Sequence, residues 1–217
     1  MDKLVSLLAQ QGREVRRVRR ENPVGAAEYS TFVAAVGRIF RAAGSLDTNF
    51  RVLSLVAAAQ YAVLLESQVI PALKNGEVII AESWWAKTWA RLGIEARRRG
   101  PLDMDNAESL NVWQRSLLPD DVVPSGNKTT VLVEAAECDR RLWYERAGCP
   151  DPVYDPAGNT SYEPDVYTRF TTEISDTLRS LAVSKDWPIV QNGADRSIEA
   201  VSSDLLAIVS KRLDTRR

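Results

Sequence analysis

Hydrophobic residues recur along the chain in two patterns, short apolar runs and helical repeats. Short runs rich in Val, Ile or Leu predict strands, and four segments qualify: 13–21, 77–81, 129–134 and 187–191. The first holds two valines among five arginines, so a helix continuation is the alternative there. Apolar positions at helical spacing predict helices at 1–11, 26–43, 48–75, 85–92, 107–118, 137–146, 164–184 and over a last segment that includes 198–209.

Several residues punctuate these elements. The repeat at 48–75 is apolar on more than one face, which predicts a buried central helix. Pro71 should kink this helix or begin a separate last turn, and Gly76 should end it. The run EVIIA at 77–81 is typical of a strand buried on both faces. Pro and Gly residues gather at 148–165 and predict a long loop, a form that often serves as a lid.

The order of the elements indicates the fold class. Single strands that alternate with helices predict an α/β fold with a parallel sheet flanked by helices. No internal repeat is visible. We expect one domain over 1–217, with a mobile lid or loop region at about 136–165.

Composition narrows the function. The chain has 217 residues, 45% hydrophobic and 26% charged, with a net charge of −1. The hydrophobic and charged fractions are typical of a globular protein. The net charge does not indicate a surface that binds nucleic acid polymers. There is no histidine, which excludes Ser-His-Asp and Cys-His nucleophile systems and His-containing zinc sites. We see neither a signal segment nor an apolar run of membrane length, so we expect a cytoplasmic protein without a membrane partner.

Charged residues follow three of the predicted strands. They are Arg19-Arg20-Glu21, Glu82-Ser83-Trp84, and Glu134 with the arginines that come after it. Ligands of parallel sheets bind at the carboxyl ends of strands. Carboxylates and arginines that converge there would suit a phosphorylated ligand with Mg²⁺. The alternative for any one of them is an ordinary solvated charge in a loop.

Several stretches then resemble a known family. RVLSLVAAAQYAVLLESQVIPALKNGEVIIAESWWAKTWARLG (51–93) is similar to the centre of the thymidylate kinases, which have a long helix, a Pro-Ala-Leu-x-x-Gly-like turn, a buried strand and an Asp-Arg-Tyr-like motif. RRENPVG resembles their Arg-Glu-Pro-Gly-Gly-like turn, and TTVLVEAAECDRRLWYERAG resembles the strand that leads to their lid arginines. The resemblance implies the P-loop fold of nucleoside monophosphate kinases.

Two departures from the family stand out. No glycine is followed by lysine, so the Gly-x-x-x-x-Gly-Lys-Ser/Thr phosphate loop is absent. The family's sheet has five strands, and the one that precedes this loop is central. We count four strands, and the first helix begins without a cap. We therefore expect that the first part of the protein is missing, through a wrongly chosen start codon or a real truncation.

The resemblance also implies roles for individual residues. Catalytic roles fall on Glu82, Arg146, Arg20 and Glu21, with Mg²⁺ held by Glu82 and with Arg140 and Arg141 as alternatives to Arg146 for the lid arginine. The acceptor would contact Gln60, Tyr61, Ser83, Trp84 and Lys87, although the family has Asp-Arg at Gln60-Tyr61 and Asp-Arg-Tyr at Glu82-Ser83-Trp84. The donor nucleotide would contact Asn192 and Arg141. Packing is the alternative role for Trp84, and a simple turn is the alternative for Asn192-Gly193.

These residues lead to one function with two alternatives. The resemblance implies an ATP-dependent kinase, in which Mg²⁺ and ATP phosphorylate dTMP or a related nucleoside monophosphate, and a homodimer that the apolar surface of 48–70 would permit. The missing loop and the replaced acceptor arginines favour a non-catalytic, kinase-like binding protein instead. An unrelated α/β protein with a chance resemblance is the third reading.

Overall fold

The computed structural model describes residues 1–18, 31–36, 38–39, 50–82, 85–99, 109, 112, 129–146, 153–154, 160–161 and 163–214. The chain divides into two compact units, one of residues 8–124 and one of residues 1–7 and 125–217. The first helix, α1 (Asp2–Gln10), begins in the second of these units and ends in the first. Gly12, with φ at +75°, follows it, as expected for a helix stop.

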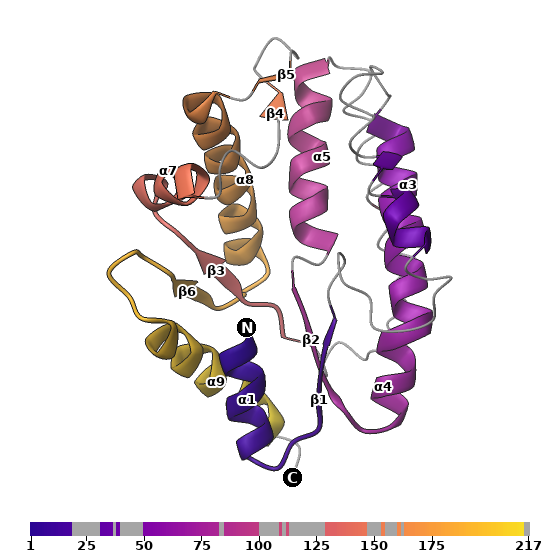
Figure 1. The fold of residues 1–217 in the computed structure, drawn as a ribbon, viewed down its shortest axis with the longest axis vertical. Coiled ribbons are helices and arrows are strands. Elements are labelled where there is room, and N and C mark those ends of the chain that lie inside the picture. The colour runs from indigo at the N-terminus through magenta and orange to yellow at the C-terminus, as the bar shows by residue number, and fades with distance from the viewer. Residues whose placement is uncertain are drawn as a thin grey trace. The chain divides into compact units, whose positions relative to one another are not determined.

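The 8–124 unit contains one parallel pair of strands among its described residues. The pair is β1 (Val15–Val18) and β2 (Val78–Ala81), in a register that runs from Val15↔Val78 to Val18↔Ala81 (Figure 1). Both strands were predicted from the sequence. The expectation that 77–81 is buried on both faces was wrong, because Ile80 alone is buried and Ala81 is exposed.

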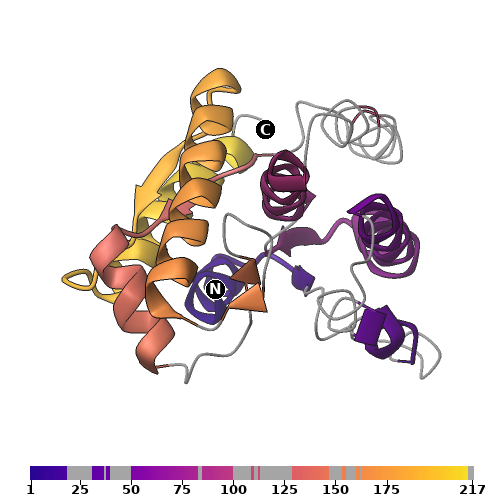
Figure 2. The same cartoon turned by 90° about the horizontal axis from the view of Figure 1, so that it is seen from above.

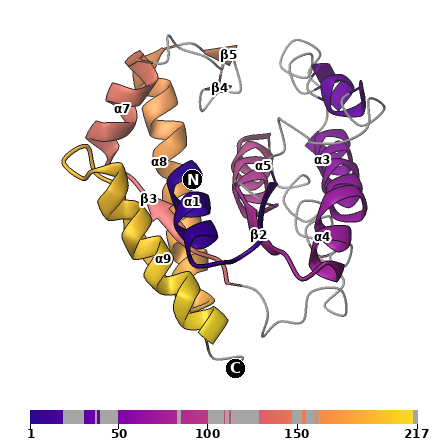
Figure 3. The ribbon, with the colours of Figure 1, turned by 60° about the horizontal axis from the view of Figure 1, so that its bottom comes forward.

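The long apolar repeat forms a rod of three helical segments. They are α3 (Phe50–Leu64), a π-helical turn η1 (Leu65–Val69) and α4 (Ile70–Lys74). Of these, α3 runs beside α5 (Trp85–Arg99), and α4 contacts β2 (Figure 3). Pro71 lies in the first turn of α4, as predicted for a separate last segment, and Gly76 ends it at φ +79°. The core of this unit joins Val18 of β1 to Ala57, Tyr61, Leu64, Leu65 and Val69.

Gln68, on the π-helical turn of this rod, is a buried polar side chain with one unsatisfied donor. Gln68 is 3% exposed, and its Nε2 has no hydrogen-bond partner. A buried donor without a partner costs about 1–3 kcal/mol. We therefore expect Gln68→Met to raise the denaturant midpoint by the equivalent of about 1 kcal/mol, whereas the same change at the exposed Gln10 leaves it unchanged. A lower midpoint for Gln68→Met would contradict this expectation.

Helix α5 is longer than the sequence predicted. It covers Trp85–Arg99, whereas the pattern predicted an end near 92. The extra residues 93–99 read GIEARRR, in which Ile94 is buried in the core and Ala, Glu and Arg are strong helix formers. Of the helices predicted at 26–43 and 107–118, the described residues 31–36, 38–39, 109 and 112 are helical. The remainder of those two segments lies outside the described residues.

The unit of residues 1–7 and 125–217 also contains a parallel pair. Strands β3 (Leu132–Glu134) and β6 (Ile189–Gln191) pair from Leu132↔Ile189 to Glu134↔Gln191. In Figure 1, α8 (Pro164–Ser184) lies above this pair and α9 (Ile198–Asp214) below it. Helix α7 (Glu137–Arg146) packs against α8 (Figure 2). These strands and helices confirm the predictions at 129–134, 137–146, 164–184 and 187–191.

The predicted loop at 148–165 contains a short ladder that the sequence did not indicate. β4 (Val153–Tyr154) and β5 (Thr160–Ser161) pair in the antiparallel sense, with Val153 opposite Ser161. Two-residue strands are too short for an alternating pattern to be recognised. Most of the remaining loop lies outside the described residues.

The structure is therefore α/β, mostly helical, with two small parallel sheets. Of the described helices, one segment, Leu55–Lys74, is long and apolar enough to cross a membrane. Half of the most apolar part of this segment is buried inside the protein. The core helix of an ordinary globular protein can have the same length and apolar composition.

Candidate functional site

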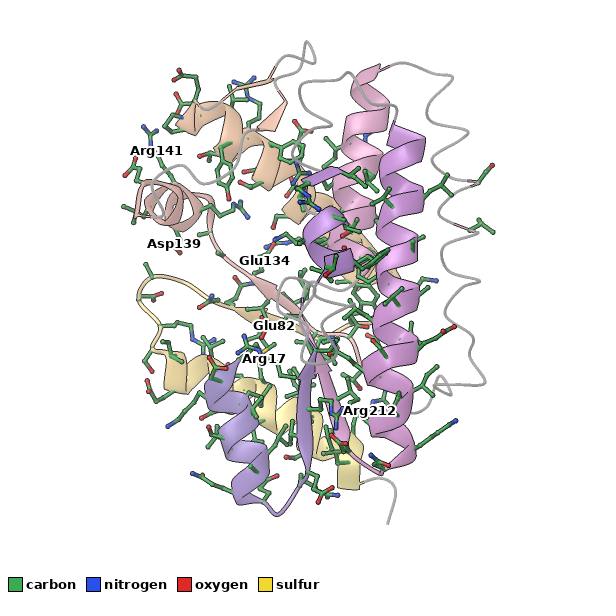
Figure 4. The ribbon with its side chains drawn as sticks, turned by 45° about the vertical axis from the view of Figure 1, so that its right-hand side comes forward. Arg17, Glu82, Glu134, Asp139, Arg141 and Arg212 are labelled. Carbon is green, nitrogen blue, oxygen red and sulfur yellow. The ribbon has the colours of Figure 1, made fainter. Side chains whose placement is uncertain are left out.

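A carboxylate and an arginine meet where β1 and β2 end. Arg17 pairs with Glu82, the residue that follows β2, and both side chains are largely buried (Figure 4). The parallel register explains the meeting. Arg17 lies opposite Ile80, and side chains two apart on a strand share a face. Arg17 and Glu82 are therefore diagonal neighbours on one face of the pair. The Glu82 N–H donates to the carbonyl of Val18 at 3.3 Å, which fixes the backbone there.

A second ion pair occupies the opposite end and face of the same strands. Arg16 Nε and Nη2 donate to the two carboxylate oxygens of Glu77 at 2.8 and 2.7 Å. Glu77 precedes β2, so this bidentate pair lies at the amino end of the two strands. Ligands of parallel sheets do not usually bind at that end. The strands thus carry one structural pair and one pair at the edge where a ligand is expected.

The sequence predicted four further residues beside Glu82 and a metal ion bound to it. Arg20, Glu21, Ser83 and Trp84 lie outside the described residues. Within the described part of the chain, no group of three or more Cys, Asp or Glu side chains could hold a metal ion. Glu82 therefore offers a single carboxylate, which suits Mg²⁺ only when substrate phosphates and water complete the shell.

The predicted acceptor residues on α3 are buried. Gln60 and Tyr61 are 3% and 7% exposed, and the Tyr61 hydroxyl shares a 2.7 Å hydrogen bond with the Thr88 hydroxyl of α5. Lys87, the preceding residue on α5, is exposed. Tyr61 thus ties two helices together in the core of its unit. Its proposed contact with a nucleotide stays a prediction.

The Tyr61–Thr88 bond has a measurable consequence. We expect Tyr61→Phe and Thr88→Ala each to lower the free energy of unfolding. A double-mutant cycle should return a coupling of about 1 kcal/mol, which is typical of a buried neutral hydrogen bond. Chemical unfolding of the four proteins measures this coupling. A coupling near zero would mean that the bond contributes nothing to stability.

A second carboxylate, Glu134, lies at the carboxyl end of β3 and is 6% exposed. It accepts hydrogen bonds from Arg179 Nε at 3.0 Å and Arg179 Nη2, from Ser175 Oγ at 3.1 Å, and from Gln191 Nε2 at 3.2 Å. The bond from Arg179 is the largest influence and lowers the pKa of Glu134, against the opposing effect of burial. This carboxylate therefore stays ionised and joins β3, β6 and α8.

Three further residues of this unit were predicted to belong to the site, namely Asn192, Arg141 and Arg146. Asn192 follows β6, and its N–H donates to the carbonyl of Glu134 at 2.7 Å. Arg141 pairs with Glu145 and Asp165 across α7 and α8. Arg146 is the last residue of α7, but its side chain lies outside the described residues. Asn192 thus acts through its backbone in the turn after β6.

A hollow of about 490 Å³ opens beside this turn. It is lined by Asp139, Gln191, Asp195 and Arg196 and by small residues of the turns after β3 and β6. Asp139 Oδ2 accepts from the Ala194 N–H at 3.1 Å and so ties α7 to the β6–α9 turn. The hollow is broad and open to solvent, so it is not an enclosed cavity.

Sequence reasoning missed Arg17, Arg179 and Asp139 as members of these clusters. A signal for Arg17 exists, because strand alternation in VRRV places Arg16 and Arg17 on opposite faces. Ser175 and Arg179 are four residues apart and share a helix face, but nothing in the sequence shows that this face meets Glu134.

Comparison with known proteins adds no assignment, since no family model and no curated protein matches this chain.

Proposed function

We propose that the protein is a nucleotide kinase-like phosphotransferase. It would move the γ-phosphoryl group of a nucleoside triphosphate, ATP by the resemblance, to dTMP or a related nucleoside monophosphate. The observation that carries the proposal is the Arg17–Glu82 pair at the carboxyl edge of two parallel strands. This is the edge at which open α/β sheets bind ligands.

The strand pairing supports the same proposal. The first predicted strand pairs with the second, and the third pairs with the fourth. These are the pairs that remain of a five-stranded sheet when its central strand is taken out, which is the arrangement that the resemblance implies. The P-loop fold itself and a single domain over 1–217 belong to this proposal.

Within the proposal, each charged residue has a defined task. Glu82 stays aligned by Arg17 and, with the substrate phosphates, would hold Mg²⁺, which neutralises phosphate charge in phosphoryl transfer. Arg146 would stabilise charge on the transferred group, because Arg141 is engaged by Glu145 and Asp165. Arg20 and Glu21 would complete the edge beyond β1. A cytoplasmic homodimer is the expected state.

One specific observation favours a second candidate, a non-catalytic, kinase-like binding protein. None of the 11 glycines in the chain is followed by lysine, so the chain offers no phosphate loop of the usual kind. This candidate keeps nucleotide binding and lacks phosphoryl transfer.

Nucleotide binding at the β1–β2 edge is the direct test. We would titrate the isotope-labelled chain with dTMP and other nucleoside monophosphates, with and without Mg²⁺, and follow the backbone amide signals of Arg17, Val18 and Glu82. At least one nucleotide should shift these signals saturably, and Arg17→Ala should weaken the response. If no nucleotide moves them, both candidate functions are wrong.

A further inference from the structure

We draw no further inference here: the strongest candidate, the side-chain cluster where Arg140 of α7 donates to Thr172 of α8 and where Arg140 Nε and the hydroxyl of the nearby Thr168 have no hydrogen-bond partner among the described residues, carries nothing because both of these atoms are closed to solvent, the hollow beside the β6–α9 turn is lined by neither side chain, and nothing in the structure points to a ligand that could reach them.

Discussion

Replacing Glu82 by Gln is expected to reduce phosphoryl transfer by about 10²-fold or more, the usual effect of removing one charged group from the reaction centre. Glu82 is held by Arg17 at the carboxyl edge of β1 and β2, and its charge would help to hold Mg²⁺ on the substrate phosphates. The loss should fall mainly on kcat, with a smaller change in the KM of the acceptor. Steady-state kinetics of the protein purified from its native host, with the substitution made in its own gene, would measure it.

Glu77→Gln is the matched control for this substitution. It removes the same charge from the same pair of strands and breaks the bidentate contact to Arg16, but at the amino end. Its kcat should stay close to that of the unmodified protein, although its stability falls. The assignment of Glu82 is contradicted if Glu82→Gln keeps full activity, or if both substitutions reduce kcat equally.

Glu134→Gln should cost about 1.5–3 kcal/mol of folding free energy at neutral pH, the range for hydrogen bonds to a buried charged group. Glu134 joins α8 and β6 through Arg179, Ser175 and Gln191. The neutral amide keeps the size of the side chain, but it offers Arg179 no charge and one fewer acceptor oxygen. Denaturant unfolding at pH 7 would measure the loss.

The pH dependence of this loss has a definite sign. Hydrogen bonds from Arg179 lower the pKa of Glu134 in the folded protein below its ordinary value of 4.5. As the pH falls, Glu134 therefore takes up its proton in the unfolded chain before it does so in the folded protein. The stabilisation that the ionised Glu134 gives to the folded protein is complete above the ordinary pKa, and it is lost as the pH falls to the lower pKa of the folded protein. The difference between Glu134→Gln and the unmodified protein should shrink in acid.

Glu145→Gln provides the comparison, because Glu145 is exposed on α7 and pairs with Arg141. Exposed pairs contribute little, so its effect should be small at every pH. An effect of Glu134→Gln that is equally small, or one that grows in acid, would show that the cluster around Glu134 does not stabilise the fold.

The sequence predicted the α/β class, the strand positions and most of the helices, because apolar periodicity reports burial directly. The strand at 13–21 is an informative case. Its two valines define β1 despite the surrounding arginines, since Val15 and Val18 pair with the apolar run at 78–81. Pro71 and Gly76 were also placed correctly, because their backbone constraints are local.

The site was less predictable, because its contacts join distant segments. Glu82 was recognised as a candidate, but its partner Arg17 was not, since the parallel register decides which of two adjacent arginines reaches it. The contact between Glu134 and Arg179 spans 45 residues and depends on how α8 packs on β3. The length of α5 was missed because Gly93 and the run of three arginines break the apolar pattern, although Ile94 beyond the glycine is buried in the core.

The most direct test of the proposed function is phosphoryl transfer by the protein purified from its native host. The protein would be incubated with Mg²⁺, γ-labelled ATP or GTP, and each nucleoside monophosphate in turn, and label in a nucleoside diphosphate would be counted. The account predicts transfer to at least one acceptor and its loss in Glu82→Gln. Saturable nucleotide binding at the β1–β2 edge without transfer from either donor would contradict it and leave the non-catalytic binding protein as the function.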